Sequence, residues 1–110
     1  MNALPPLITD HLDEVRALCE KYHVKRLTLF GSAVKGTFDP ETSDLDFAVE
    51  FLPATPPGGL HGPYFSLLRD LQELFERNID LVDRGRIENP YFLQVLELTQ
   101  HDVYGSPAAA

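Results

Sequence analysis

Residues 44–51 read DLDFAVEF and alternate between apolar and polar or small side chains at almost every position. A period of two is typical of a β-strand with one buried face, because successive side chains point to opposite sides of the strand. The Leu, Phe and Val side chains share one predicted face, and the acidic side chains and Ala48 share the other. This segment therefore predicts a strand at the centre of the fold.

The flanking sequence predicts further strands and helices around this strand. Two short segments are rich in strand-forming residues, and three longer segments carry apolar residues three or four positions apart, as amphipathic helices do. This order of elements predicts an α/β (α+β) domain, a sheet with helices packed on it. We expect strands at residues 24–30 and 79–82, helices at 8–22, from 60 or 64 to 77 and from 90 onward, and a short extended piece at 102–104.

Four residues are expected to mark helix ends. Thr9 is a candidate N-cap of the first helix, because its hydroxyl can accept from a free backbone N–H. Asn78 is expected to end the second helix, since Asn tolerates the left-handed conformation. Asn89 is expected to cap the last helix, with Pro90 at its first position.

Length and composition limit the classes of protein to which this chain can belong. The 110 residues suffice for one domain, expected to span 1–110 with a frayed tail at about 105–110. A net charge of −8 disfavours direct binding to a nucleic-acid backbone, although a nucleotide could bind through metal ions. The single cysteine excludes a disulfide framework. No apolar run suits a membrane span, and the first ten residues do not resemble a secretory signal, so we expect a cytoplasmic protein.

Asp44 and Asp46 are the first candidate site residues. Two residues apart on a strand, they project from the same face with Cα atoms about 6–7 Å apart. Their carboxylates could share Mg²⁺, which favours carboxylate oxygens combined with substrate phosphates. Alternatively, both are ordinary residues on a solvated face, although Asp is depleted in strands.

Gly31 and Ser32 follow the segment at 24–30 and predict a turn. Backbone N–H groups and a hydroxyl at such a turn can hold phosphate oxygens. Alternatively, this is a plain turn that ends a strand, which Gly and Ser both favour.

The two features together resemble a family signature. Residues 31–36 (GSAVKG), a short loop and residues 43–46 (SDLD) are similar to the G-S-x-A-R-G and S-D-h-D motifs of the minimal nucleotidyltransferases. These are the MNT-type branch of the DNA polymerase beta-like superfamily. Val34 and Lys35 replace the family's usual Ala and Arg, and Lys lacks the planar fork of Arg.

The family also carries a third acidic residue on a later strand. Asp80 matches it in residues 79–82 (IDLV), whereas Asp83 falls outside the alternation and is expected at the strand end. With the Asn-Pro helix start and the late tyrosine Tyr104, the resemblance runs from about residue 24 to residue 104.

The resemblance implies a fold and a chemistry. The fold would be the small mixed sheet of the polymerase beta-like nucleotidyltransferases. The chemistry would be in-line nucleotidyl transfer, with Asp44, Asp46 and Asp80 holding two Mg²⁺ ions and Asp80 assisting the acceptor hydroxyl. The implied nucleotide-binding residues are Gly31, Ser32, Lys35 and Ser43.

The resemblance also implies a partner. MNT-type proteins commonly pair with helical HEPN proteins as antitoxin and toxin, and members transfer AMP from ATP to a tyrosine of the HEPN ribonuclease. We therefore expect an adenylyltransferase antitoxin in a hetero-oligomer. Two alternatives remain: an antitoxin that inhibits by binding alone, and a nucleotidyltransferase acting on a small-molecule hydroxyl. Base specificity, acceptor identity and stoichiometry stay open.

Overall fold

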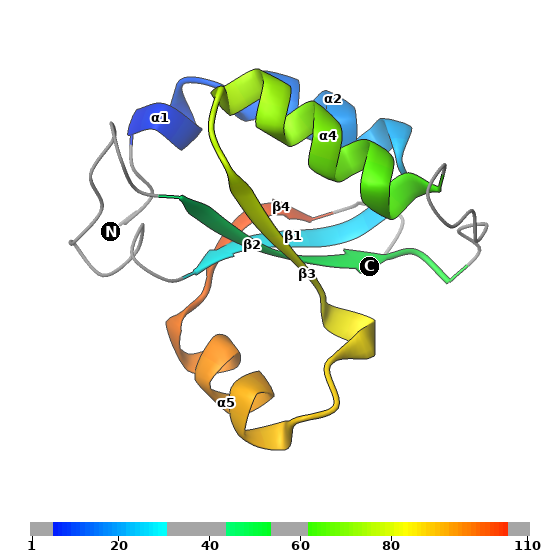
Figure 1. Cartoon of the computed structure of the whole chain (residues 1–110), viewed down its shortest axis with the longest axis vertical. Helices are drawn as coiled ribbons and strands as arrows, with labels where there is room; N and C mark the ends of the chain where they lie inside the picture. The colour runs from blue at the N-terminus through cyan, green and yellow to red at the C-terminus, as the bar shows by residue number, and fades with distance from the viewer. Residues whose placement is uncertain (1–5, 31–43, 54–61, 106–110) are drawn as a thin grey trace.

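A computed structural model describes residues 6–30, 44–53 and 62–105 of the chain. These residues form a four-stranded sheet in the order β3-β2-β1-β4 (Figure 1). The strands are β1 (Val24–Phe30), β2 (Leu45–Phe51), β3 (Ile79–Asp83) and β4 (His101–Gly105).

The sheet is mixed, as expected. Strand β1 pairs antiparallel with both β2 and β4, whereas β2 and β3 run parallel. Parallel neighbours cannot be joined by a tight turn, and helix α4 (Pro63–Phe75) lies in the connection from β2 to β3. The crossover therefore places two strands side by side that start at the same end of the sheet.

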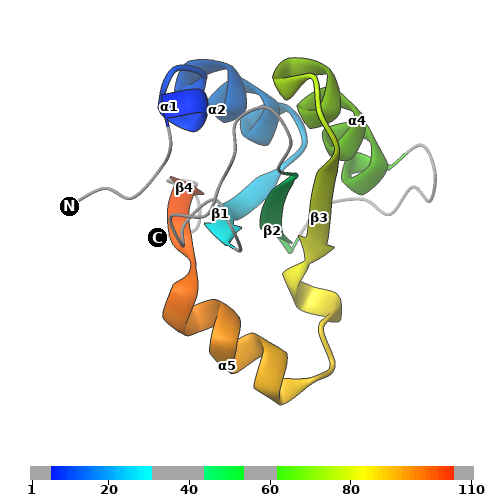
Figure 2. The same cartoon turned by 60° about the vertical axis from the view of Figure 1, so that its left-hand side comes forward.

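Helices cover the two faces of the sheet unequally (Figures 1 and 2). Helices α1 (Pro6–Thr9), α2 (Leu12–Lys21) and α4 lie on one face, and α5 (Pro90–Thr99) lies alone on the other. The main core lies under the first group. It takes Leu45, Phe47 and Val49 from β2, all fully buried, as the alternation predicts.

The second face is partly covered as well. Ala48 and Leu96 are each only 1% exposed, although neither belongs to the main core cluster. The rings of Phe30 in β1 and Phe92 in α5 lie 6.1 Å apart in an edge-to-face contact. Helix α5 therefore packs on the face that carries the acidic residues of β2.

The predicted strands are confirmed with small shifts at their ends. β1 has the predicted bounds, β2 begins at Leu45 with Asp44 directly before it, and β3 extends one residue further, to Asp83. The extended piece predicted at residues 102–104 is the edge strand β4. The predicted cap of α5 is confirmed, since the Asn89 Oδ1 accepts a hydrogen bond from the Tyr91 N–H at 2.9 Å.

The prediction of one continuous helix at residues 8–22 is wrong. The chain turns at residues 10 and 11, so two helices, α1 and α2, replace one. The Thr9 hydroxyl donates to the Pro6 carbonyl at 3.2 Å and does not cap α2, whose N-cap residue is His11. The turn follows Ile8, which is fully buried in the core, and periodicity alone did not reveal the change of direction.

The predicted end of α4 is also wrong. The left-handed residue is Glu76, with φ 51° and ψ 44°, and not Asn78. The Asn78 carbonyl already accepts a hydrogen bond from the Leu45 N–H at 3.3 Å, at the start of the β2–β3 pairing. The chain must therefore reverse before Asn78, directly after the buried Phe75.

Glu76 provides a test of this turn. A left-handed conformation is costly for residues other than Gly, so Glu76→Gly should raise the free energy of unfolding by about 0.5–1 kcal/mol. The same substitution at the exposed Glu73, inside α4, should lower it by about 1 kcal/mol. Urea unfolding of both variants measures the two signs, and a stability loss in both would contradict the left-handed turn.

Candidate functional site

Asp46 occupies the centre of the acidic face. The register places it beside Asp80 in the parallel neighbour β3 and opposite Phe30 in the antiparallel neighbour β1. Residues paired across strands point to the same side of a sheet. The structure thus brings Asp46 and Asp80 side by side on the α5 face, and Asp44 directly precedes the strand that carries Asp46.

The electrostatics show that the three carboxyl groups interact. Burial raises the pKa of Asp46 to about 6, together with a hydrogen bond to the Asp80 side chain and the negative charges of Asp80 and Asp44. Asp44 and Asp80 are exposed, whereas Asp46 is half-buried. At neutral pH the site therefore concentrates negative charge without internal compensation, since no ion pair among the described residues involves these three.

This donor set fits a hard cation. Closely spaced carboxylates suit Mg²⁺, which is usually held by one or two carboxylates and completed by substrate phosphates and water. Among the described residues, no three His, Cys, Asp or Glu side chains form a metal-binding group on their own. The metal roles of Asp44, Asp46 and Asp80 accordingly stay predictions.

The four predicted nucleotide-binding residues, Gly31, Ser32, Lys35 and Ser43, lie outside the described residues. Their roles also stay predictions.

Asp83 is confirmed as a strand-end residue. Its carboxylate accepts a hydrogen bond from the Gly85 N–H at 3.0 Å and thereby caps the short helix η2 (Arg84–Arg86). A carboxylate engaged in this way serves local structure. Asp80, three residues earlier on β3, is the acidic residue of this strand that pairs with Asp46 in the register.

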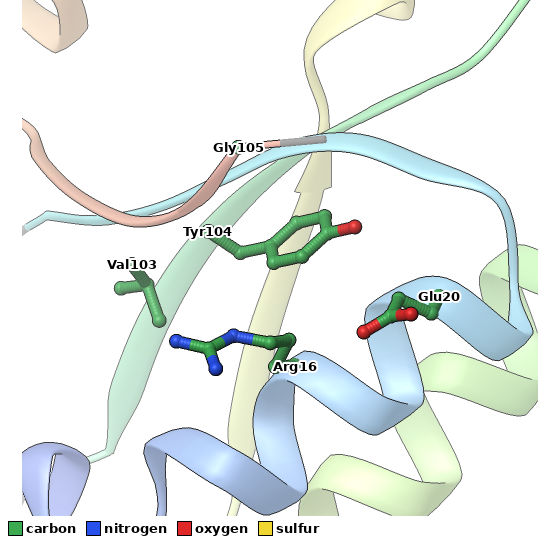
Figure 3. Close-up of a pocket in the computed structure, with 5 residues that line it drawn as sticks. All are labelled: Arg16, Glu20, Val103, Tyr104 and Gly105. Atoms are coloured by element: carbon green, nitrogen blue, oxygen red, sulfur yellow. The ribbon is translucent and has the colours of Figure 1, made fainter. Parts of the chain in front are cut away.

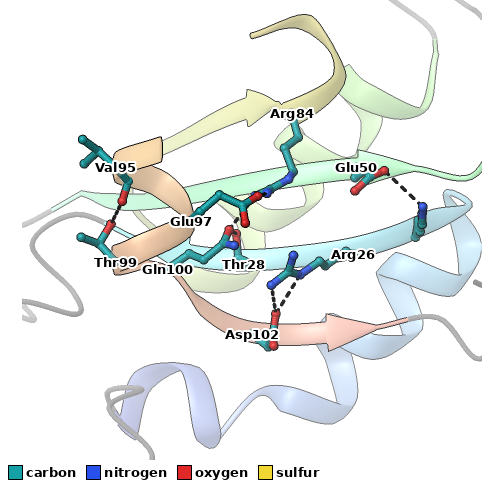
Figure 4. Close-up of polar contacts among 10 residues, drawn as sticks. Arg26, Thr28, Glu50, Arg84, Val95, Glu97, Thr99, Gln100 and Asp102 are labelled. Carbon is teal, nitrogen blue, oxygen red and sulfur yellow. Dashed lines mark hydrogen bonds and ion pairs between the residues drawn. The ribbon is translucent and has the colours of Figure 1, made fainter. Parts of the chain in front are cut away.

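A polar network that sequence reasoning missed ties α5 to the sheet (Figure 4). The buried Thr28 of β1 donates to the Gln100 side-chain oxygen at 3.0 Å, and Arg84 donates to the same oxygen at 2.6 Å. Arg84 also contacts Glu97 of α5. The network holds both ends of the segment from β3 to β4, and so fixes α5 above the acidic face.

A cavity of about 240 Å³ lies elsewhere (Figure 3). It opens between α2 and the edge strand β4, on the face of the sheet that α1, α2 and α4 cover. None of the predicted site residues lines it. Its lining residues are Arg16, Glu20, Val103, Tyr104 and Gly105.

The thiol of Cys19 does not qualify as a catalytic group. Burial raises the pKa of the Cys19 thiol to about 12, so it stays protonated in the core and is no nucleophile at neutral pH.

No helix among the described residues is long and apolar enough to cross a bilayer.

Comparison with known proteins identifies the class. The sequence matches the nucleotidyltransferase domain family over residues 14–98, and the chain therefore belongs to that family. It is 38% identical over 82 residues to a protein of Methanocaldococcus jannaschii named as a candidate protein adenylyltransferase, covering 74% of this chain and 79% of the relative. The chain is accordingly a nucleotidyltransferase.

Solved structures place it more narrowly by fold. A minimal nucleotidyltransferase structure superposes with a TM-score of 0.70 at 23% identity, covering 92% of this chain and 95% of the other. A structure described as a tri-AMPylated Shewanella oneidensis HEPN toxin in complex with MNT antitoxin gives a TM-score of 0.63 at 18% identity, covering 92% and 75%. The fold is that of the minimal nucleotidyltransferases, as the sequence motifs predicted.

The pKa of Asp46 leads to a test of the site. Because the pKa of Asp46 is raised from 3.8 to about 6 on folding, its ionisation costs stability as the pH rises through this range. In metal-free buffer, Asp46→Asn should raise the free energy of unfolding by about 1 kcal/mol at pH 7.5 and change it little at pH 4. This figure is discounted because the group is partly exposed. Urea unfolding at both pH values measures the difference.

Glu50→Gln is the matched control. Glu50 lies on the same face of β2, but its carboxylate pairs with the Lys25 ammonium at 3.3 Å. Its substitution should give a small loss at pH 7.5 instead of a gain. A stability gain in both variants would indicate a general response to net charge and would contradict a specific Asp46–Asp80 interaction.

Proposed function

We propose that this nucleotidyltransferase transfers AMP from ATP to a tyrosine hydroxyl of a partner HEPN ribonuclease toxin, and thereby acts as its antitoxin in the cytoplasm. The observation that carries the proposal is the paired carboxylates Asp46 and Asp80, adjacent to Asp44, on the face of the sheet that α5 covers only in part. The name of the adenylyltransferase relative and the AMPylated toxin in the similar solved complex supply the donor and the partner.

The chain's own residues account for the transfer step as follows. The acceptor oxygen attacks the α-phosphorus of ATP, a new oxygen–phosphorus bond forms, and the bond to the bridging oxygen breaks to release pyrophosphate. Asp80, which is exposed, receives the hydroxyl proton. Asp44, Asp46 and Asp80 would hold Mg²⁺, and bound Mg²⁺ supplies positive charge that offsets the charge of the triphosphate.

Labelling in a lysate tests the transfer. The purified protein is incubated with Mg²⁺ and α-³²P-ATP in a lysate of its source cells, and a labelled protein band is expected. Asp80→Asn should lower the labelling rate at least about a hundredfold, because it removes a carboxylate at the reacting atoms. Asp83→Asn, on the same strand, should retain most of the activity, because Asp83 caps η2.

The alternatives give different results. Label in the low-molecular-weight fraction alone would indicate a small-molecule acceptor and would contradict transfer to protein. For the antitoxin role, Asp44→Ala is expressed with the toxin, and loss of growth protection is expected. Full protection by Asp44→Ala would instead indicate inhibition by binding.

Metal dependence is tested separately. Calorimetry should show that removing Mg²⁺ with EDTA weakens ATP binding at least about tenfold, because uncompensated carboxylates repel the triphosphate. The Asp44→Asn/Asp46→Asn variant should show little Mg²⁺ dependence. Equal ATP affinity of the wild-type protein with and without Mg²⁺ would contradict the metal site.

A further inference from the structure

Helix α5 has two apolar sides, and the sheet covers only one. Its inner side includes Phe92, in contact with Phe30, and Leu96, which is 1% exposed. On its outer side Tyr91 is 72% exposed, Val95 37% and Leu98 79%. We call these three residues the outer stripe.

The spacing of the outer stripe makes it a continuous surface. Tyr91, Val95 and Leu98 are four and three residues apart, so they fall within about 60° of one another around the helix. In the described part of the chain, the one other large apolar side chain of comparable exposure is Phe65, on α4. Clustered exposed apolar residues commonly mark an interaction site, whereas single ones are ordinary.

The stripe belongs to the helix that packs on the face of the sheet with the carboxylates. Tyr91 adjoins Phe92, whose ring contacts Phe30, and Phe30 lies opposite Asp46 in the β1–β2 register. Helix α5 is also fixed to the sheet at its other end through Gln100. A protein seated on the outer stripe would therefore lie on the same side of the sheet as Asp46 and Asp80, on a helix that is held to the sheet at both ends.

The charge around the stripe indicates the kind of partner. Residues 87–102 carry Glu88, Glu97 and Asp102 and contain no Lys or Arg. The side chains of Glu97 and Asp102 are 58% and 70% exposed. Glu97 is paired with Arg84, whose side chain is only 11% exposed, and Asp102 is paired with Arg26 at 2.8 Å, so these two charges are partly compensated. A second copy would oppose acidic borders with acidic borders in a chain of net charge −8, whereas a basic surface would complement them.

We propose that the outer stripe is the docking surface for the acceptor protein. The acceptor presents an apolar surface bordered by Lys and Arg side chains, and this contact brings its hydroxyl to the Asp46–Asp80 pair. The proposal rests on the proposed transfer to protein, and it adds the surface and the chemistry by which the acceptor is recognised. Apolar contact supplies affinity, and the charged border selects the partner.

Photo-crosslinking tests the docking surface without requiring transfer. The full chain is prepared with p-benzoylphenylalanine in place of Leu98, or in place of Phe65 as the matched control, and is irradiated in a lysate of its source cells. At least ten times more adduct is expected from position 98. Mass spectrometry of the adduct should identify a partner peptide with apolar residues flanked by Lys or Arg.

The outcomes separate the two proposals. An adduct between two copies of this chain, an acidic contact peptide, or equal adduct from both positions would overturn the docking proposal. A basic partner crosslinked at position 98 that is never labelled from α-³²P-ATP would support docking and overturn transfer to that partner.

A kinetic variant gives a second measurement on the labelled acceptor. Leu98→Lys should raise the KM for the acceptor protein at least tenfold and leave kcat and ATP binding unchanged, because the Leu98 side chain is 79% exposed and lies on the side of α5 away from the sheet. Phe65→Lys should leave the KM unchanged. An unchanged KM in Leu98→Lys would overturn the proposal, and circular dichroism checks that both variants are folded.

Discussion

The parallel pairing of β2 with β3 is the constraint on which the rest of this molecule depends. It sets Asp46 and Asp80 side by side, a contact between like charges that is unfavourable at neutral pH. The pairing persists because the opposite face of the same strands carries Leu45, Phe47 and Ile79 into the core. Apolar burial on one face of the sheet thus holds acidic groups together on the other. A cation bound between the carboxylates, as in the proposed Mg²⁺ site, would reduce this repulsion.

The features of the fold and the site that could be predicted from the sequence are those set by a pattern within a few neighbouring residues. The alternation in residues 44–51 identified the central strand and its buried side, and the Asn89-Pro90 pair identified the start of α5. Asp83 lies three residues after Asp80, so the two side chains fall on opposite faces of a strand, and this spacing distinguished the candidate site residue from the strand-end residue. All three are patterns within a few residues, and each reflects a steric or hydrogen-bonding rule that holds without tertiary context.

The sequence-based predictions were wrong or incomplete where contacts between residues far apart in the sequence determine the structure. The break between α1 and α2 and the left-handed Glu76 depend on where the chain must turn to meet the sheet, which periodicity does not contain. The Thr28–Gln100–Arg84 network joins residues up to 72 positions apart, so no local motif reveals it. The outer stripe was missed for a related reason. The sequence shows that α5 is apolar, and only packing shows which of its sides is left exposed.

The position of β4 has a consequence for how the chain folds as it is synthesised. β4 completes the sheet by pairing with β1, yet Leu29 of β1 must wait for His101 to emerge before that edge is satisfied. During translation β1 can pair with β2 early, but the backbone groups on its other edge stay unpaired until residues 101–105 have been synthesised. An edge left open in a nascent chain is a template for wrong pairing. Pairing with β4 covers that edge of β1 and leaves as the new edge a strand of only five residues, which is a shorter template for wrong pairing.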